Sequence, residues 1–416
     1  MGRVHVVGAG LAGLACALRL AARGVEVAVY EAAGHAGGRC RSFFDQSLEC
    51  DIDNGNHLLM SANTAALDYL TEIGARDSLI EPDAAFPFID LGTGQTWTVR
   101  PNNGPIPWWL LNRSRGIPDT RLTDYLGAAR LALAGRDRTV GDCVPTAGPL
   151  WERFWEPFTV AVLNTPAADA SAQLVWMVLR ESFMRGARYC KPMIARDGLS
   201  VSFIDPALKQ LRSKGIEPAF GARLRAAALE DGKVSSLDFG GDSVPVGPDD
   251  RVVLAIPPAG AAAILPEVTV PRTSCTIFNA HMRLDQTVEM PNGIPFLGVI
   301  GGTAQWLIVR QNVISATISA ADHLMEEPAD SIADRVWDDT RRALNLNLAE
   351  RPPIRVIKER RATFAQTPEE IRRRPGTRTR MSNLILAGDW TDTGFPATIE
   401  GAIRSGHAAA AALAGQ

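Results

Sequence analysis

Hydrophobic residues in the first part of the chain change from an extended to a helical pattern and back again. Residues 4–7 form a short apolar run that leads directly into glycines, which predicts a buried strand followed by a turn. Residues 11–23 continue as an apolar stretch of helical length, and residues 25–30 predict a second strand. These segments predict one compact β-α-β unit at the start of the chain.

The rest of the chain alternates between helical and extended segments. Residues 63–191 carry mostly helical patterns, as in the aromatic residues between 151 and 158, where Pro157 is expected to end or kink a helix. Later elements are predicted as strands at 215–237, 251–256, 276–284 and 307–320, a helix at 332–344, and a closing strand and helix from residue 383 onward.

This order of elements predicts the α/β class with two interleaved domains. A Rossmann-like dinucleotide-binding domain is expected to comprise residues 1–62, 192–268 and 382–416. An α+β substrate domain is expected to comprise residues 63–191 and 269–381. The chain would therefore leave the first domain twice and return to it twice.

The composition of the chain narrows the classes of partner. Across 416 residues the formal net charge is −3, so no overall positive charge favours nucleic acid, and we expect no such partner. The six cysteines lack any paired spacing, which favours reduced thiols in the cytosol, and we expect no metal site. No secretion signal and no apolar run long enough to cross a membrane is expected.

A glycine motif follows the first predicted strand and opens the first predicted helix. Gly8 allows a tight turn, Gly10 lets the backbone approach a diphosphate, and Gly13 lets helix and strand pack closely. The start of the helix, with Leu11 and Ala12, offers free N–H groups and a partial positive charge to phosphate. The motif predicts a bound dinucleotide but does not separate NAD from FAD.

Glu31 ends the second predicted strand, at the spacing where a carboxylate accepts hydrogen bonds from a ribose 2′-hydroxyl. The next loop contains Gly37, Gly38 and Arg39, and an arginine offers a planar pair of donors to phosphate oxygens. These residues resemble the flavin amine oxidase and carotenoid desaturase superfamily, in which the glycines pass close to the FAD phosphates and the arginine contacts them. A glycine loop with a solvated arginine is the alternative.

A stretch near the end of the chain resembles the second flavin motif of the same superfamily. Gly388 and Asp389 correspond to a motif whose aspartate accepts hydrogen bonds from the ribityl hydroxyls of FAD. The helix that begins near Ile399 would direct its N-terminus at the flavin, and Leu224 would lie beside the adenine. The resemblance thus implies one FAD, held without a covalent bond.

A closer resemblance, over essentially the whole chain, is to the hydroxysqualene dehydroxylase family. The segments that carry it are residues 51–57, 155–157, 162–166, 196–200, 205–207 and 387–405. It implies flavin contacts from Gly55, Asn56 and His57, although family members often carry glutamine in place of Asn56. Thr398, another expected flavin contact, stands where amine oxidases carry an aromatic cage residue, and residues 275–330 contain no lysine, so amine oxidation is disfavoured.

The reaction implied by this resemblance is the replacement of the allylic hydroxyl of hydroxysqualene by a hydride from reduced FAD, giving squalene for hopanoids or sterols. Hydroxide leaves poorly, so a proton donor is needed near the flavin, and a dry aromatic pocket would stabilise positive charge. His57 and His281 are the candidate catalytic residues. A purely structural hydrogen bond is the alternative role for each histidine.

The apolar isoprenoid substrate sets a constraint on location. Its carbon chain would gain on the order of 20 kcal/mol by leaving water, so it is expected to come from a membrane or from a squalene-pathway synthase. We expect a cytoplasmic protein at the inner face of the membrane, with residues 105–111, Arg113 and Arg115 as the lipid contact or as a buried hinge. The arginines of 372–380 would either contact headgroups or form a solvated loop.

Two other functions are compatible with the sequence. A carotenoid or phytoene-type desaturase or isomerase would use the same cofactor in the opposite direction and withdraw hydride from a polyene precursor. A non-catalytic lipid- or prenyl-binding protein of the same fold would lack FAD. The presence of Glu31, Arg39 and Asp389 argues against the binding protein.

Overall fold

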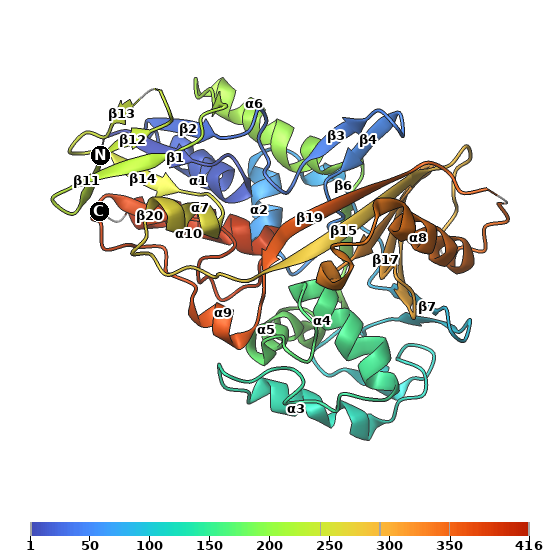
Figure 1. Cartoon of the computed structure of the whole chain (residues 1–416). Helices are drawn as coiled ribbons and strands as arrows, with labels where there is room; N and C mark the ends of the chain where they lie inside the picture. Colours follow the sequence, from blue (N-terminus) through green and yellow to red (C-terminus); the bar gives the residue numbers. More distant parts are fainter. Residues whose placement is uncertain (1, 242, 291–292, 349, 415–416) are drawn as a thin grey trace.

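Five parallel strands form the sheet that carries the predicted β-α-β unit, in the order β10-β2-β1-β14-β20 (Figure 1). The computed structural model describes residues 2–241, 243–290, 293–348 and 350–414. It confirms β1 (Val4–Val7), α1 (Leu11–Ala22) and β2 (Val27–Glu31) within two residues of the predicted ends. The remaining strands of this sheet are β10 (Ala219–Phe220), β14 (Arg251–Leu254) and β20 (Leu384–Leu386).

Helices cover this sheet and leave α1 buried on nearly every side. α1 packs against β1, β2 and α10 (Ile399–Ala414), and a Cβ on Gly406 would lie only 2.2 Å from the carbonyl oxygen of Ala12. α2 (Thr64–Glu72) packs on α10, and α6 (Asp205–Ser213) packs on α1. α2 shares this apolar core although the sequence places the second domain from residue 63 onward. The domain boundaries stay a prediction.

A second, mixed sheet of seven strands runs in the order β19-β15-β18-β17-β16-β7-β8. Its strands are β7 (Phe86–Asp90), β8 (Thr96–Val99), β15 (Ser274–Arg283), β16 (Phe296–Ile300), β17 (Trp306–Arg310), β18 (Val313–Ile318) and β19 (Ile354–Phe364). The stretch predicted as extended at 307–320 is a hairpin, because Gln311 has a positive φ of +56° and turns the chain. α8 (Ala329–Ala343) packs its apolar side on this sheet.

Short helices from the middle of the chain lie at one end of the second sheet (Figure 1). They are α3 (Gly127–Ala132), α4 (Glu156–Leu163), α5 (Ala172–Glu181) and the 3₁₀ helices Trp108–Leu111 and Leu122–Leu126. The prediction that Pro157 ends a helix is wrong, and the alternative that it kinks the helix stays a prediction. A π-helical turn at Trp151–Trp155 precedes Pro157, which stands in the first turn of α4, where a missing N–H breaks no helical hydrogen bond.

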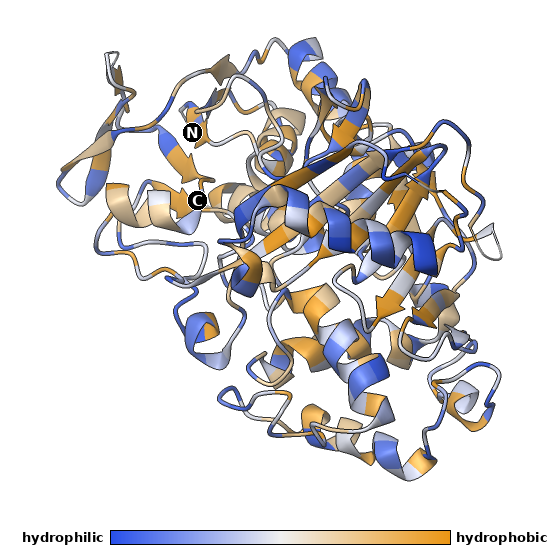
Figure 2. Ribbon diagram, turned by 45° about the vertical axis from the view of Figure 1, so that its right-hand side comes forward, coloured by the Kyte–Doolittle hydropathy of each residue, from blue (hydrophilic) through white to orange (hydrophobic). Residues whose placement is uncertain are grey.

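Smaller elements complete the fold. They are β3 (Ser42–Asp45), β4 (Cys50–Asp53), β5 (Leu59–Met60), β6 (Leu79–Ile80), β9 (Pro192–Ala195), β11 (Ala226–Glu230), β12 (Lys233–Asp238), β13 (Ser243–Pro245), α7 (Pro258–Ile264) and α9 (Pro368–Arg372). Figure 2 shows hydrophobic residues along many strands and hydrophilic ones on the outer helices. Among helices of the described ranges, none combines the length and apolar character that a membrane crossing needs.

Candidate active site

The turn after β1 lies so close to its neighbours that two of its glycines have no room for a side chain. A Cβ on Gly8, whose φ is +108°, would lie 2.3 Å from the carbonyl oxygen of Ala255. A Cβ on Gly13 would lie 1.9 Å from the carbonyl oxygen of Gly8. Around Gly10, by contrast, no atom lies within 4 Å of an added Cβ. Gly8 and Gly13 therefore permit the close packing, whereas Gly10 borders open space.

Gly37 and Gly38 lie beside this turn and extend the same open surface. Gly37 forms a parallel bridge with Gly10, and its N–H donates to the carbonyl oxygen of Ala9 at 2.8 Å. A Cβ on Gly38 would lie 3.6 Å from the Cα of Gly10. No side chain caps the N-terminus of α1 within the part of the chain that the structure describes. Its first N–H groups, including those of Leu11 and Ala12, suit a bound diphosphate.

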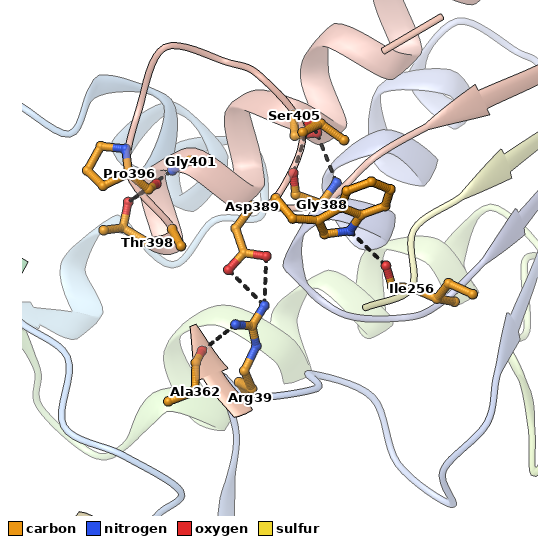
Figure 3. A network of polar contacts seen from close by, with 12 residues as sticks. Arg39, Ile256, Ala362, Gly388, Asp389, Pro396, Thr398, Gly401 and Ser405 are labelled. Atoms are coloured by element: carbon orange, nitrogen blue, oxygen red, sulfur yellow. Dashed lines mark hydrogen bonds and ion pairs between the residues drawn. The ribbon is translucent and has the colours of Figure 1, made fainter. Parts of the chain in front are cut away.

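Arg39 follows these glycines and is partly open to solvent. Its guanidinium donates to both carboxylate oxygens of Asp389 at 2.8 Å and to the carbonyl oxygen of Ala362 on β19 (Figure 3). Its side chain is 40% accessible, so it borders a space that a bound molecule can enter. The neighbouring Asp389 raises the pKa of Arg39, so the guanidinium stays charged and paired with this carboxylate.

Glu31 and Leu224 lie together at the C-terminal end of β2. The Glu31 carboxylate accepts hydrogen bonds from the N–H groups of Ala9 and Ala33, both at 2.8 Å, so it is held in place with further lone pairs free for a hydroxyl. The N–H of Ala222 donates to the carbonyl oxygen of Glu31 at 2.8 Å, which brings the segment with Leu224 alongside. The residues predicted for the adenosine end are thus neighbours.

Gly388 and Asp389 directly follow β20, and neighbouring residues fix the backbone there. The N–H of Gly388 donates to Ser405 Oγ at 2.9 Å, and its φ is +142°. A Cβ on Gly388 would lie 2.5 Å from the indole nitrogen of Trp390, which itself donates to the carbonyl oxygen of Ile256 at 2.9 Å. This packing directs the Asp389 carboxylate toward Arg39 (Figure 3).

Thr398 and Ile399 form the start of α10. The Thr398 hydroxyl accepts a hydrogen bond from the N–H of Gly401 at 3.2 Å, and the Ile399 side chain is buried. Figure 3 shows Thr398 on the same chain segment as Asp389, after the loop that precedes α10. Their predicted contacts with flavin stay a prediction.

The loop after β4 is attached to the second sheet through buried amides. The Asn56 amide donates to Thr317 Oγ1 at 2.9 Å and to the carbonyl oxygen of Ser315 at 3.1 Å. A Cβ on Gly55 would lie 3.2 Å from the amide nitrogen of Asn279. The amide N–H groups of Asn56 are therefore already used by the sheet, which leaves its carbonyl oxygen for a cofactor.

His57 extends from this loop and is half-buried. Burial lowers its pKa to about 4, with Asp53 opposing the shift and Arg39 adding to it. The ring is therefore neutral at pH 7. Like Arg39, His57 is partly accessible, and Arg39 is close enough to lower its pKa, so the two side chains lie near each other.

His281, the second predicted histidine, has no exposed surface. Its Nδ1 lies 2.8 Å from Ser315 Oγ, and its Nε2 has no hydrogen-bond partner among the described residues. Burial lowers its pKa to about 4, again with Asp53 opposing the shift. The structure thus brings both histidines near Asp53 but leaves only His57 open to a ligand.

Asp53 is a site residue that sequence reasoning missed. One carboxylate oxygen accepts hydrogen bonds from Ser42 Oγ at 2.6 Å and from the N–H of Leu199 at 3.0 Å, and the other lies 2.7 Å from an Arg310 guanidinium nitrogen. The buried acid therefore connects β4, β17 and the loop before α6. Asp53 lies in the segment 51–57 that carries the family resemblance, but no local pattern indicates its ion pair with Arg310.

Arg374 also has an unexpected position. The sequence predicts that the arginines of 372–380 contact headgroups or form a solvated loop. Both predictions are wrong for Arg374, because its side chain is buried. Its guanidinium donates to the carbonyl oxygens of Phe395, Asp389 and Thr391. Burial lowers its pKa. Arg374 holds the second flavin motif in shape, and no local sequence pattern indicates this.

An aromatic cluster extends from the loop with His57 into the helical region. Leu58 packs against the same core as Phe183, whose ring centroid lies 5.8 Å from those of Phe86 and Phe158. Trp109 follows at 6.3 Å from Phe183. These side chains form an apolar region next to the loop that carries His57.

Comparisons with known proteins agree with this geometry. The chain matches the family described as flavin containing amine oxidoreductase over residues 11–414. It is 44% identical to hydroxysqualene dehydroxylase of Sinorhizobium fredii over 98% of this chain and 97% of that protein. Hydroxysqualene dehydroxylase of Rhodopseudomonas palustris is 45% identical over the same shares. The structure of cyclohexylamine oxidase from Brevibacterium oxydans matches with a TM-score of 0.75 at 15% identity, over 100% of this chain and 99% of that one, which shows a shared fold.

Proposed function

Because the chain belongs to the family of flavin-containing amine oxidoreductases, we propose that it is an FAD-dependent enzyme that converts hydroxysqualene to squalene. The full-length agreement with two hydroxysqualene dehydroxylases carries this proposal. The fold alone would not, since one fold serves many reactions. Amine oxidation stays disfavoured, because residues 275–330 contain no lysine and Thr398 stands in place of an aromatic cage residue.

The cofactor is FAD, and the residues of the candidate active site fit it. The open backbone at Gly10 and the N-terminus of α1 suit its diphosphate, with Arg39 supplying charge. Glu31 would bind the adenosine ribose and Asp389 the ribityl hydroxyls. When reduced, FAD supplies the hydride, so hydroxysqualene, reduced flavin and a proton give squalene, water and oxidised flavin.

The protein must help the hydroxyl leave, and we assign this task to His57. With a pKa of about 4, His57 donates readily in the small fraction of molecules that carry the proton, and the hydroxyl must be protonated to leave as water. His281 is sealed from any ligand, so it acts by packing beside Asp53 beneath the loop. The rings of Phe158 and Phe183 would stabilise positive charge on the allylic carbon.

The apolar isoprenoid substrate also implies where it is collected. We propose that the protein works in the cytoplasm at the inner face of the membrane and takes hydroxysqualene from the bilayer or from a squalene-pathway synthase. The gain of on the order of 20 kcal/mol on leaving water keeps such a chain out of solution. The exposed Trp108 and Leu111 support this proposal for residues 105–111, whereas Trp109 is buried beneath them.

The test of the function is to offer both substrate classes to both redox states of the purified protein. Reduced protein with detergent-dispersed hydroxysqualene should form squalene, and oxidised protein with phytoene should form no polyene, as judged by mass spectrometry of the extracted lipid. Arg39→Met protein without flavin is the control. A polyene product would favour a desaturase, and a native protein without flavin would favour a lipid-binding protein.

A further inference from the structure

Exposed hydrophobic side chains gather in the helical region of the molecule. Ten large hydrophobic side chains are exposed among the described residues, and seven of them lie between residues 106 and 184. They are Ile106, Trp108, Leu111, Leu122, Leu126, Leu133 and Met184. Leu133 is 87% exposed, Leu126 70% and Trp108 61%. We call these seven side chains the apolar patch.

The parts of the apolar patch rest on one common core. Trp109 and Leu131 are buried in the same cluster, and Tyr125 packs against it. The N–H of Ala187 donates to the carbonyl oxygen of Asn102 at 2.9 Å, which places the segment with Met184 beside the segment with Trp108. In the 3₁₀ helix Trp108–Leu111, Trp109 is buried and its neighbours Trp108 and Leu111 are exposed. The 3₁₀ helix Leu122–Leu126 has no buried residue, and its Tyr125 is half-buried against the cluster. Figure 2 shows hydrophobic stretches among these short helices.

The charge around the apolar patch is opposite to that of the chain as a whole. Residues 100–138 contain seven arginines and three aspartates, a net charge of +4, in a chain whose net charge is −3. Arg113, Arg121 and Arg130 are exposed. None of these three has an ion-pair partner within the described ranges. Apolar side chains interspersed with unpaired arginines suit the boundary between acyl chains and anionic headgroups.

A second copy of the chain fits this surface less well. A symmetric dimer through the apolar patch would bring the same unpaired arginines of both copies face to face, and like charges oppose association. An anionic bilayer instead offers acyl chains to Trp108, Leu111 and Leu126 and phosphates to the arginines.

We propose that the apolar patch docks on an anionic phospholipid bilayer and orients the aromatic cluster toward the membrane. This proposal deepens the proposed function and rests on it, because the substrate of that function is a membrane lipid. Trp109 lies under the patch, and Phe183 connects it to the core that contains Leu58, the neighbour of His57. The docking surface and the candidate active site thus share one continuous apolar core.

The test is co-sedimentation of the full-length, FAD-loaded protein with vesicles of phosphatidylcholine containing phosphatidylglycerol. The variant Trp108→Ser/Leu111→Ser/Leu126→Ser should bind about a hundredfold more weakly, since three large side chains no longer insert. The variant Arg113→Gln/Arg121→Gln/Arg130→Gln should bind anionic vesicles more weakly, by about fivefold per charge removed. Its binding to vesicles of phosphatidylcholine alone should equal that of the native protein.

The matched control is Phe44→Ser/Val201→Ser/Leu229→Ser, which removes three exposed hydrophobic side chains elsewhere and should bind as the native protein does. Equal binding by the patch variant and this control would overturn the proposal. A second outcome would also overturn the proposal: the native protein is a dimer in ultracentrifugation, the patch variant is a monomer, and neither protein binds vesicles.

Turnover of detergent-dispersed hydroxysqualene separates this proposal from the proposed function. Patch variants should retain turnover in detergent and lose it only for substrate presented in vesicles. Vesicle binding without any turnover would leave the docking surface intact and contradict the function. Turnover by a protein that does not bind vesicles would overturn the docking surface alone.

Discussion

At the residue scale, the charge inside the cofactor space depends on a pair of side chains from opposite ends of the chain. Arg39 is held by two hydrogen bonds to Asp389, while Arg374 holds the backbone around Asp389 through carbonyl groups. A guanidinium fixed in this way meets a diphosphate without reorganising. The pair therefore matters for cofactor binding more than for folding.

Replacing Arg39 should show this directly. Arg39→Met removes a charged donor pair, so FAD should bind roughly 30-fold to 100-fold more weakly, as measured by fluorescence titration of the flavin-free protein. Arg372→Met is the matched control, because Arg372 pairs with Asp137 on the surface. Equal FAD affinity in the two variants would contradict the assignment of Arg39.

His57 predicts a pH dependence. The pKa of His57 is about 4, so its protonated fraction falls as the pH rises, by tenfold per unit above the pKa. The rate of squalene formation in a single turnover should fall in the same direction between pH 6 and 8. His57→Gln should be at least about 100-fold slower and lose this dependence while keeping its FAD. An unchanged profile would rule out His57 as the proton donor; His323→Gln, at an exposed histidine, is the control.

His281 predicts an acid-labile fold. Burial lowers its pKa from 6.5 to about 4, so the unfolded chain binds more protons between these values. The free energy of unfolding therefore falls as the pH falls, and His281 accounts for on the order of 2 kcal/mol by pH 4.5. His281→Gln should lose that part of the acid sensitivity in urea unfolding at pH 7 and pH 4.5. A variant as acid-sensitive as the native protein would refute this.

At the scale of elements, the turn between β1 and α1 contains one glycine that the fold requires, Gly13, and one that we assign to cofactor binding, Gly10. Gly13→Ala should destabilise the protein by about 3 kcal/mol or more, because its Cβ would meet the carbonyl oxygen of Gly8. Gly10→Ala should change stability by less than about 1 kcal/mol, since nothing lies near its Cβ, but should weaken FAD binding at least tenfold. Urea unfolding and FAD titration measure the two effects. Equal loss of stability in both variants would contradict this separation.

The elements that the sequence predicted well are those determined by local chemistry. The β-α-β unit follows from short-range periodicity and from glycines whose backbone conformation is local. The turn at Gln311 lacks glycine, and Pro157 starts an α-helix after a π-helical turn, so neither boundary has a clear local signal. Asp53 was missed because its role depends on Arg310, which is distant in the sequence. Arg374 was missed because it binds Asp389 through the backbone carbonyl oxygen, which every residue has.

At the scale of the whole molecule, the two sheets meet around the cofactor space. β19 contributes the carbonyl oxygen of Ala362 to Arg39, and β18 contributes Thr317 to Asn56. The first sheet thus supplies the dinucleotide-binding turn, and the second sheet supports the loop that carries His57. The helical region adds the aromatic cluster, which leads from this loop toward the apolar patch.

The most direct test of the central claim is an anaerobic single turnover in deuterated water. The protein is photoreduced, mixed with hydroxysqualene, and followed by flavin absorbance while the lipid is extracted for mass spectrometry. The account predicts one squalene per reoxidised flavin, with one deuterium at the carbon that carried the hydroxyl, since the flavin hydride exchanges with solvent. Flavin that stays reduced beside unchanged hydroxysqualene would contradict the account.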